Sequence, residues 1–211
     1  MGMLYYDYTT CVARKSRGKF KGSRGDFRMN ETVKNLTERK SCAAFKPEHI
    51  SREEIDEIVA AGLNAPSGMN AQGALLIVVQ DDEAVAELSE LNAKAAREML
   101  SKVNPAAAAG FPADPFYGAK DVIAVVAKKG ATHIYDGSLV MGNLMNAAWS
   151  MGIDSRWIHR AKEVFESEKG KEILAKLGIN DEVEGIGFCV LGHAAKEKPK
   201  TEIKPNRVFY L

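Results

Sequence analysis

The chain has 211 residues, 45% of them hydrophobic, which is enough to bury one substantial core in one or two domains. Its formal net charge of +1 is unevenly divided, because residues 1–28 carry seven Lys and Arg against two Asp, a net of +5, and the remainder has a net of −4. A mildly acidic body argues against nucleic-acid binding across the fold. No run approaches the roughly 20 apolar residues that span a bilayer.

The basic head, residues 1–28, lacks the apolar segment of a signal peptide. We expect it to be an unstructured extension, or not native if the natural start is Met29, in front of one globular domain at 29–211. A nucleic-acid or membrane-surface arm is the alternative interpretation of the same charges.

Helical and strand patterns alternate along the body. Ser51 and Glu54 form a capping box, which predicts a helix with one apolar face that stops at 64–68. A helix at 135–151 is apolar nearly all round, so we expect it in the core or in a subunit interface. The other expected elements are strands at 74–79, 122–127 and 185–192, helices from 81 to about 103 and at 165–177, and a surface loop at 104–118. The tail, 196–211, is basic and ends in four apolar residues, which suggests docking against a partner subunit.

Many enzyme signatures are missing from the sequence. No glycine-rich nucleotide loop, HExxH, CxxC or GxSxG motif is present, and the histidines are dispersed. The three cysteines have no metal-ligand spacing, so we expect no metal. Their sparse, odd number favours a reducing compartment, and we expect a cytoplasmic protein. Chemistry then has to come from a bound cofactor or from groups that folding brings together.

Three separated segments could bind a ligand. In the first, Arg39, Lys40 and Ser41 follow a predicted helix, and two cations beside a hydroxyl suit a dianionic phosphate. Cations at a helix C-terminus also complement the helix dipole without any ligand.

The second and third segments carry amide and aromatic side chains. Residues 65–72 combine small residues with the amides of Asn70 and Gln72, which suits a flat ligand with mixed donors and acceptors, such as a flavin edge, or an ordinary polar turn. In residues 155–160, Trp157 and Ile158 could flank a ring system, or Trp157 could be a buried residue of a strand or turn.

In this order, the segments resemble the nitroreductase family. Its members carry Arg-Arg-Ser-x-Arg-x-Phe, then Ala-Pro-Ser-x-x-Asn-x-Gln, then a Cys-Trp-Ile-Gly-like turn and a basic C-terminal stretch. The corresponding segments are RKSCAAF (39–45), APSGMNAQ (65–72), SRWIHR (155–160) and LGHAAKEKPK (191–200). Residues 136–153 also resemble the family's central helix, and the resemblance runs from about residue 30 to the end.

The resemblance implies an α+β fold, in which helices wrap a central mixed β-sheet and two chains form an intertwined homodimer with FMN at the interface. It implies an enzyme that takes electrons from NAD(P)H and passes them, in a ping-pong cycle, to a nitro compound, quinone or similar small acceptor. The expected FMN-binding residues are Arg39, Lys40, Ser41 and Lys200 at the phosphate, Pro66, Ser67, Asn70 and Gln72 along the ring, with Asn70 from the other subunit, and Trp157, Ile158 and His159 over the ring.

Four positions depart from the family pattern. Ala43 stands where a second cation is usual, Gly73 replaces a Pro, His159 replaces a Gly and Ile203 lies near an expected Arg. Loss of the cation expected at position 43 makes an anionic reduced flavin harder to form. His159 could donate a proton to the acceptor or only pack. An alternative function is therefore a regulatory or storage protein of the same fold that binds flavin without turnover.

Overall fold

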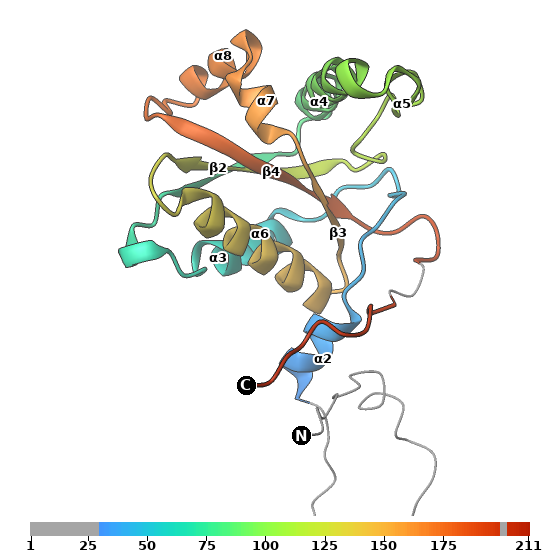
Figure 1. Ribbon diagram of the computed structural model, residues 1–211, viewed down its shortest axis with the longest axis vertical. Coiled ribbons are helices and arrows are strands. Elements are labelled where there is room, and N and C mark those ends of the chain that lie inside the picture. The colour runs from blue at the N-terminus through green and yellow to red at the C-terminus, as the bar shows by residue number, and fades with distance from the viewer. Residues whose placement is uncertain (1–29, 199–201) are drawn as a thin grey trace, which may run out of the picture.

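Four strands form one sheet in the order β1-β2-β4-β3, and every pair of neighbours is antiparallel. The computed structural model describes residues 30–198 and 202–211 (Figure 1). The strands are β1 (Ala74–Val79), β2 (Asp121–Lys128), β3 (Asp154–Ile158) and β4 (Val183–Gly192). The basic head lies outside the described residues, so the boundary at residue 28 stays a prediction.

Helices cover both faces of this sheet (Figure 1). One face carries α3 (Arg52–Leu63) and α6 (His133–Ser150), and the other carries α4 (Asp82–Val103), α7 (Ala161–Glu166) and α8 (Glu168–Lys176). The remaining elements are α2 (Glu31–Glu38), α5 (Pro105–Ala109) and the 3-10 turn η1 (Gly68–Asn70). The α+β class with a helix-wrapped sheet is confirmed. Among the residues that the structure describes, the parallel component of the expected mixed sheet is a single bridge, between Ser41 and Ser155.

The central strand β2 is apolar on both sides because both of its faces are covered. Val122, Ala124 and Val126 pack toward α4 and α7, whereas Ile123, Val125 and Ala127 pack toward α3 and α6. A bulge shifts the register against β4, since Val125 pairs with Gly187 and Val126 with Gly185. The bulge reverses the alternation along β4, so that Ile186 and Phe188, two residues apart, lie in the core clusters of opposite faces.

Helix termini follow the predicted capping signals in two places and depart from them in two others. The Ser51–Glu54 capping box is confirmed, and Asp81 caps α4. The expected loop at 104–118 is wrong in part, because Asn104 caps the short helix α5 and Pro105 occupies its first turn. The expected helix at 165–177 is two helices, because the Ser167 side chain caps α8 at the break.

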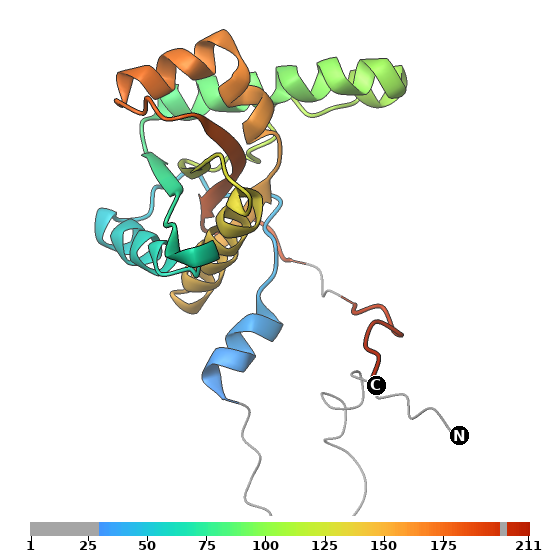
Figure 2. The same ribbon diagram turned by 60° about the vertical axis from the view of Figure 1, so that its left-hand side comes forward.

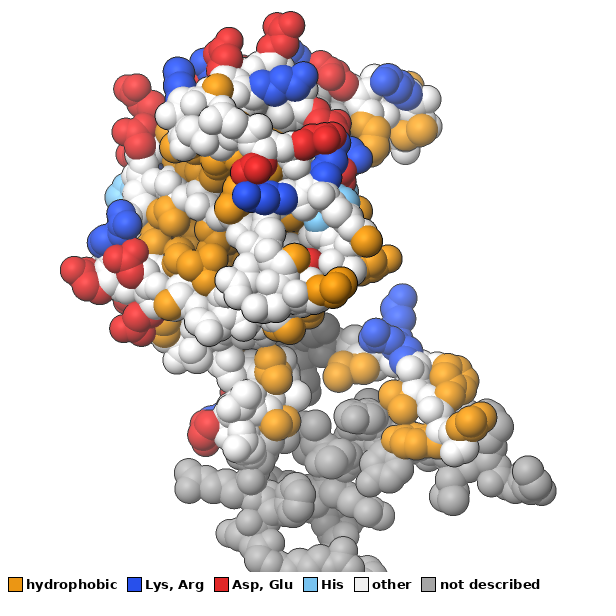
Figure 3. Space-filling model, turned by 90° about the vertical axis from the view of Figure 1, so that its left-hand side faces the viewer, with side chains coloured by type: hydrophobic (Ala, Val, Ile, Leu, Met, Phe, Trp, Pro, Cys, Tyr) orange, Lys and Arg blue, Asp and Glu red, His pale blue; other side chains and the backbone are white. Residues whose placement is uncertain are grey.

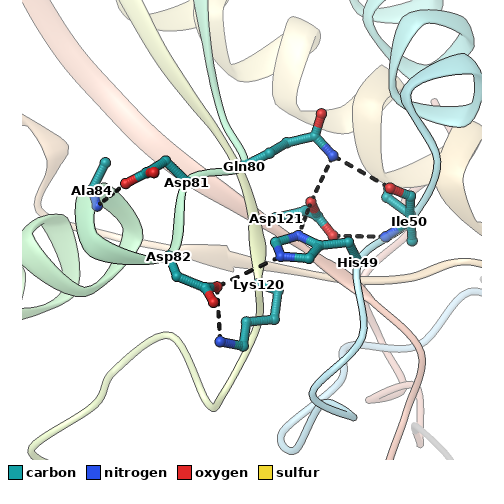
Figure 4. A network of polar contacts seen from close by, with 8 residues as sticks. All are labelled: His49, Ile50, Gln80, Asp81, Asp82, Ala84, Lys120 and Asp121. Carbon is teal, nitrogen blue, oxygen red and sulfur yellow. Dashed lines mark hydrogen bonds and ion pairs between the residues drawn. The ribbon is translucent and has the colours of Figure 1, made fainter.

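A buried carboxylate ties the segment before α3 to the sheet (Figure 4). Asp121, at the start of β2, accepts hydrogen bonds from Ile50 N (2.9 Å) and Gln80 Nε2 (2.9 Å), and His49 Nδ1 lies 3.0 Å from it. Asp121 is fully buried, so these partners replace its lost hydration. Next to it, the hydrogen bond from Lys120 lowers the pKa of Asp82 at the start of α4.

The helical hairpin of α4 and α5 projects beyond the rest of the fold (Figure 2). Hydrophobic side chains are exposed in the middle of the face turned to the viewer in Figure 3. Exposed large hydrophobic residues of α3, η1 and α6 are Leu63, Met69, Ile134, Tyr135 and Leu139. None of the described helices has both the length and the apolarity to cross a bilayer.

Candidate functional site

The first predicted segment lies along the edge strand β3. Arg39 is the C-cap of α2, and the chain then runs beside β3, where Ser41 forms a parallel bridge with Ser155. Cys42 N donates to Ser155 O (3.0 Å), and Arg156 Nη1 donates back to Cys42 O (2.9 Å). Folding therefore brings the first and third predicted segments together, although they are more than 110 residues apart in the chain.

Two buried polar atoms in these adjoining segments have no protein partner. Within the described part of the chain, Arg39 Nη1 and Ser155 Oγ are buried and make no hydrogen bond. Arg39 is close enough to Cys189 on β4 to act on it electrostatically: burial raises the pKa of this thiol to about 12, and Arg39 lowers it only in part. A neutral thiol does not balance the guanidinium charge, and the buried Nη1 donor of the half-buried Arg39 is unfavourable without an acceptor. The arrangement fits an anionic group that enters from outside the fold.

The beginning of the C-terminal arm is fixed beside this position. Lys40 Nζ donates to Lys198 O (3.5 Å), and the Lys198 ammonium contacts the buried carboxylate of Asp154 and lies 4.4 Å from the centroid of the Trp149 ring. Asp154 also accepts from Ala194 N (3.0 Å). Asp154 and Trp149 were not among the residues predicted for the site. Lys200 was predicted, but it lies outside the described residues.

The third segment forms β3 and the turn that follows it. Trp157 is half-buried and its indole lies where a Cβ on Gly187 would stand, 2.4 Å from Nε1, so this glycine makes room for the ring. Ile158 points into the core on the opposite face, which leaves only its backbone for a ligand. His159 is exposed, and Arg160 adopts a left-handed conformation with φ 76°.

The second segment is an exposed loop with its own internal bonds. Ser67 Oγ accepts from Gln72 N (3.0 Å), and Gln72 Nε2 donates to Asn70 Oδ1 (3.0 Å). Met69, Asn70 and Gln72 have positive φ, a conformation that costs a residue other than glycine about 1–2 kcal/mol. Pro66 is exposed at its start. This strain, held by side-chain bonds, gives the loop a defined shape.

This loop does not meet the other two segments within one chain. Gly68 N donates to Asp136 near the start of α6 (3.0 Å), whereas Asn35, just before Arg39, donates to Asn146 O near its end (2.8 Å). The ten residues between these anchors span ~15 Å of helix. Residues 39–41 and 155–159 therefore form one half of the candidate site, and residues 65–72 lie at the far end of α6.

Comparison with known proteins agrees with this architecture. Residues 36–193 match the nitroreductase family. A protein of Archaeoglobus fulgidus provisionally named NADH dehydrogenase/NAD(P)H nitroreductase is 30% identical over 185 residues, which are 85% of this chain and 97% of that protein. The FMN reductase [NAD(P)H] of Bacillus subtilis is 40% identical over 63 residues, but the match spans only 30% of this chain and 25% of that enzyme.

A solved structure extends the agreement to three dimensions. The nitroreductase of Desulfitobacterium hafniense with bound FMN has a TM-score of 0.78 at 28% identity, over 87% of this chain and 100% of that chain. An antiparallel sheet covered by helices on both faces, with the three motif segments in this order, is the architecture of the nitroreductase class. The chain belongs to the nitroreductase family.

Proposed function

We propose that this chain binds FMN and works in the cytoplasm, the reducing compartment that its cysteine usage favours, as an NAD(P)H-dependent oxidoreductase. The observation that carries the proposal is the pair of buried, unpartnered atoms, Arg39 Nη1 and Ser155 Oγ. A phosphate would supply the missing anion and acceptors with charge-assisted hydrogen bonds. The D. hafniense nitroreductase, whose fold this chain shares, holds FMN.

The residues of β3 and its neighbours would hold and orient the cofactor. Arg39, Lys40 and Ser41 bind the phosphate, with Lys200 as a further predicted contact, while Trp157 and His159 cover the ring. Bound FMN supplies the electron-transfer chemistry, and the protein sets its position and electrostatic surroundings. The exposed imidazole of His159 could hold a proton beside the ring.

A second copy of the chain would complete the site. On α6, the exposed apolar residues Tyr135 and Leu139 are followed on the same helix face by Gly142, where a Cβ would meet no atom within 4 Å. Such a face suits an antiparallel crossing of α6 with its copy in a two-fold dimer. That crossing brings the loop at 65–72, with Pro66, Ser67, Asn70 and Gln72, from one chain toward Arg39 of the other.

The electron donor is NADH or NADPH, and the acceptor is a nitro compound, a quinone or a similar small molecule. The names of the A. fulgidus and B. subtilis relatives support the nicotinamide donor. A second candidate function is flavin binding without turnover. Ala43 favours it, because its exposed side chain brings no cation to the position where the family pattern has one.

The test is a visible spectrum of the purified protein with added FMN, followed by anaerobic addition of NADH and, separately, NADPH. Perturbed flavin absorbance at stoichiometric FMN, bleached by either nicotinamide and restored by an acceptor, supports the enzyme. Bound flavin that neither nicotinamide reduces points to the second candidate. A protein that leaves the spectrum of free FMN unchanged refutes both.

A further inference from the structure

A buried asparagine on α4 holds the turn that follows β3. Asn92 lies on the face of α4 that packs on the sheet, together with Val85 and Leu88, and is only 1% exposed. Its Nδ2 donates to the backbone oxygen of His159 at 2.6 Å. A buried amide needs a hydrogen-bond partner, and the partner of this one is in the candidate site itself.

The turn at 158–160 has an unfavourable conformation that its neighbours maintain. Arg160 is left-handed at φ 76°, ψ 19° and caps α7 without a side-chain hydrogen bond. The missing Cβ of Gly185 lets Ala161 lie directly on β4, since that atom would stand 2.2 Å from the Ala161 carbonyl. On the other side, Arg160 Nη1 lies 3.2 Å from Met99 Sδ of α4. Strained backbone of this kind persists only where surrounding contacts determine it.

We propose that Asn92 is a positioning residue, which fixes the His159 peptide against the flavin ring from the buried face of α4. The inference rests on the proposed function, which places this turn at the ring. The C=O and N–H of a trans peptide point in opposite directions, so holding the His159 carbonyl toward α4 directs the Arg160 N–H away from it. Asn92 acts on the ring through this peptide and not by contact.

The experiment compares Asn92→Leu, which removes the donor with little change in volume, and Asn92→Ala, which removes it with a smaller side chain, with Ser89→Ala as a matched control. Ser89 lies one turn earlier on the same buried face, and its hydroxyl donates to Asp114 (2.6 Å), away from the turn. Amide hydrogen exchange of residues 158–162 is measured on the protein without FMN. FMN affinity, flavin reduction potential and the rate of reduction by NAD(P)H are measured with FMN.

We expect exchange in the turn to rise about five- to tenfold in both Asn92 variants and to stay unchanged in Ser89→Ala. The rate of flavin reduction should fall roughly tenfold or more, because a displaced peptide spoils the alignment at the ring. The dissociation constant of FMN should change less than about threefold, since the phosphate contacts at Arg39 are intact.

If amide exchange in the turn is unchanged in both Asn92 variants, Asn92 does not hold the turn, whether or not flavin binds. If exchange is faster but the flavin reduction potential and the rate of flavin reduction are unaltered, Asn92 holds the turn but has no effect on the cofactor. If the unsubstituted protein binds no FMN, the proposed function fails and the coupling to flavin fails with it, while the exchange data still decide whether Asn92 holds the turn. Should Asn92→Leu not fold, Asn92→Ala carries the same comparison.

Discussion

Replacing Arg39 with Met should weaken FMN binding without weakening the fold. The change keeps an unbranched side chain about as long as the aliphatic stem of Arg but removes a guanidinium whose Nη1 is buried and unpaired among the described residues. A hydrogen bond to a charged group contributes about 1.5–3 kcal/mol, so we expect FMN to bind roughly 10- to 100-fold less tightly. Since a buried charge without a partner is unfavourable, the FMN-free variant should be as stable as its parent or up to ~1 kcal/mol more stable.

Thermal unfolding with and without FMN measures both effects at once. At an FMN concentration of about 100 times the parent's dissociation constant, binding stabilises the parent by ~2.7 kcal/mol, and a roughly 30-fold loss of affinity leaves ~0.9 kcal/mol. For a domain of this size, the difference corresponds to a loss of about 4–7 °C in the FMN-induced rise of Tm.

Arg52→Met is the matched control for this prediction. It also removes one cation, from the solvent-exposed pair with Asp56 (2.9 Å) in the first turn of α3, and should leave the FMN-induced rise unaltered. An Arg39→Met protein that is destabilised by more than about 1 kcal/mol without FMN, yet keeps the parent's FMN affinity, would show that Arg39 has a structural role and does not bind the phosphate.

Three further predictions concern the interface, the buried carboxylate and a helix cap. Gly142→Leu should shift the protein from dimer to monomer in light scattering and cost it FMN, because a side chain there blocks the crossing of the two α6 helices; a stable dimer with full FMN content would contradict the crossing. Asp121→Asn should lower the free energy of unfolding by about 2–4 kcal/mol in urea, because its amide nitrogen faces donors from Ile50, Gln80 or His49; a loss below about 1 kcal/mol would show that the network is not needed. Ser51→Ala should cost ~1 kcal/mol at pH 7, because it removes the N-cap of α3. The backbone N–H of Ser51, and after it the Ser51 hydroxyl, lower the pKa of Glu54 by donating to its carboxylate. Ser51→Ala keeps the backbone donor, so only the hydroxyl's share of the cost depends on pH: it is complete above the ordinary Glu pKa and is lost as the pH falls through the lowered value, whereas the loss of the bond from Glu54 N persists in acid. A cost that is larger in strong acid than at pH 7 would contradict this coupling.

Local signals account for the elements that could be predicted from the sequence. The capping box at Ser51 and the cap at Asp81 act within one helical turn, so residues next to each other in the chain determine them. Helix α5 was not predicted, although Asn104 followed by Pro105 is itself a signal for the start of a helix. The proline, glycine and alanine residues of the segment 104–118 favoured a surface loop instead. The break at Ser167 was missed because apolar spacing continues across it.

Long-range contacts decide the site, and short-range patterns do not contain them. The order of the motifs indicated which segments contribute to the site. The bridge between Ser41 and Ser155, however, depends on the path of the chain after α2 along the edge strand β3, which no local pattern encodes. Polar residues at positions that pack on the sheet were the signals available for the missed positions. Asn92 lies at helical spacing from Val85 and Leu88 and donates to the His159 carbonyl, and Asp154 begins the edge strand β3 and accepts from Ala194 N.

The length of α6 links cofactor binding to subunit association. Because the ~15 Å between its two anchors separates the loop at 65–72 from Arg39, the proposed site needs this loop from a second chain to enclose the ring. If two copies build each site, FMN stabilises the dimer and the dimer strengthens FMN binding by the same free energy. The apparent FMN affinity should then rise with protein concentration in the parent. In Gly142→Leu it should be weak and independent of concentration, which distinguishes loss of the partner from loss of the phosphate contact in Arg39→Met.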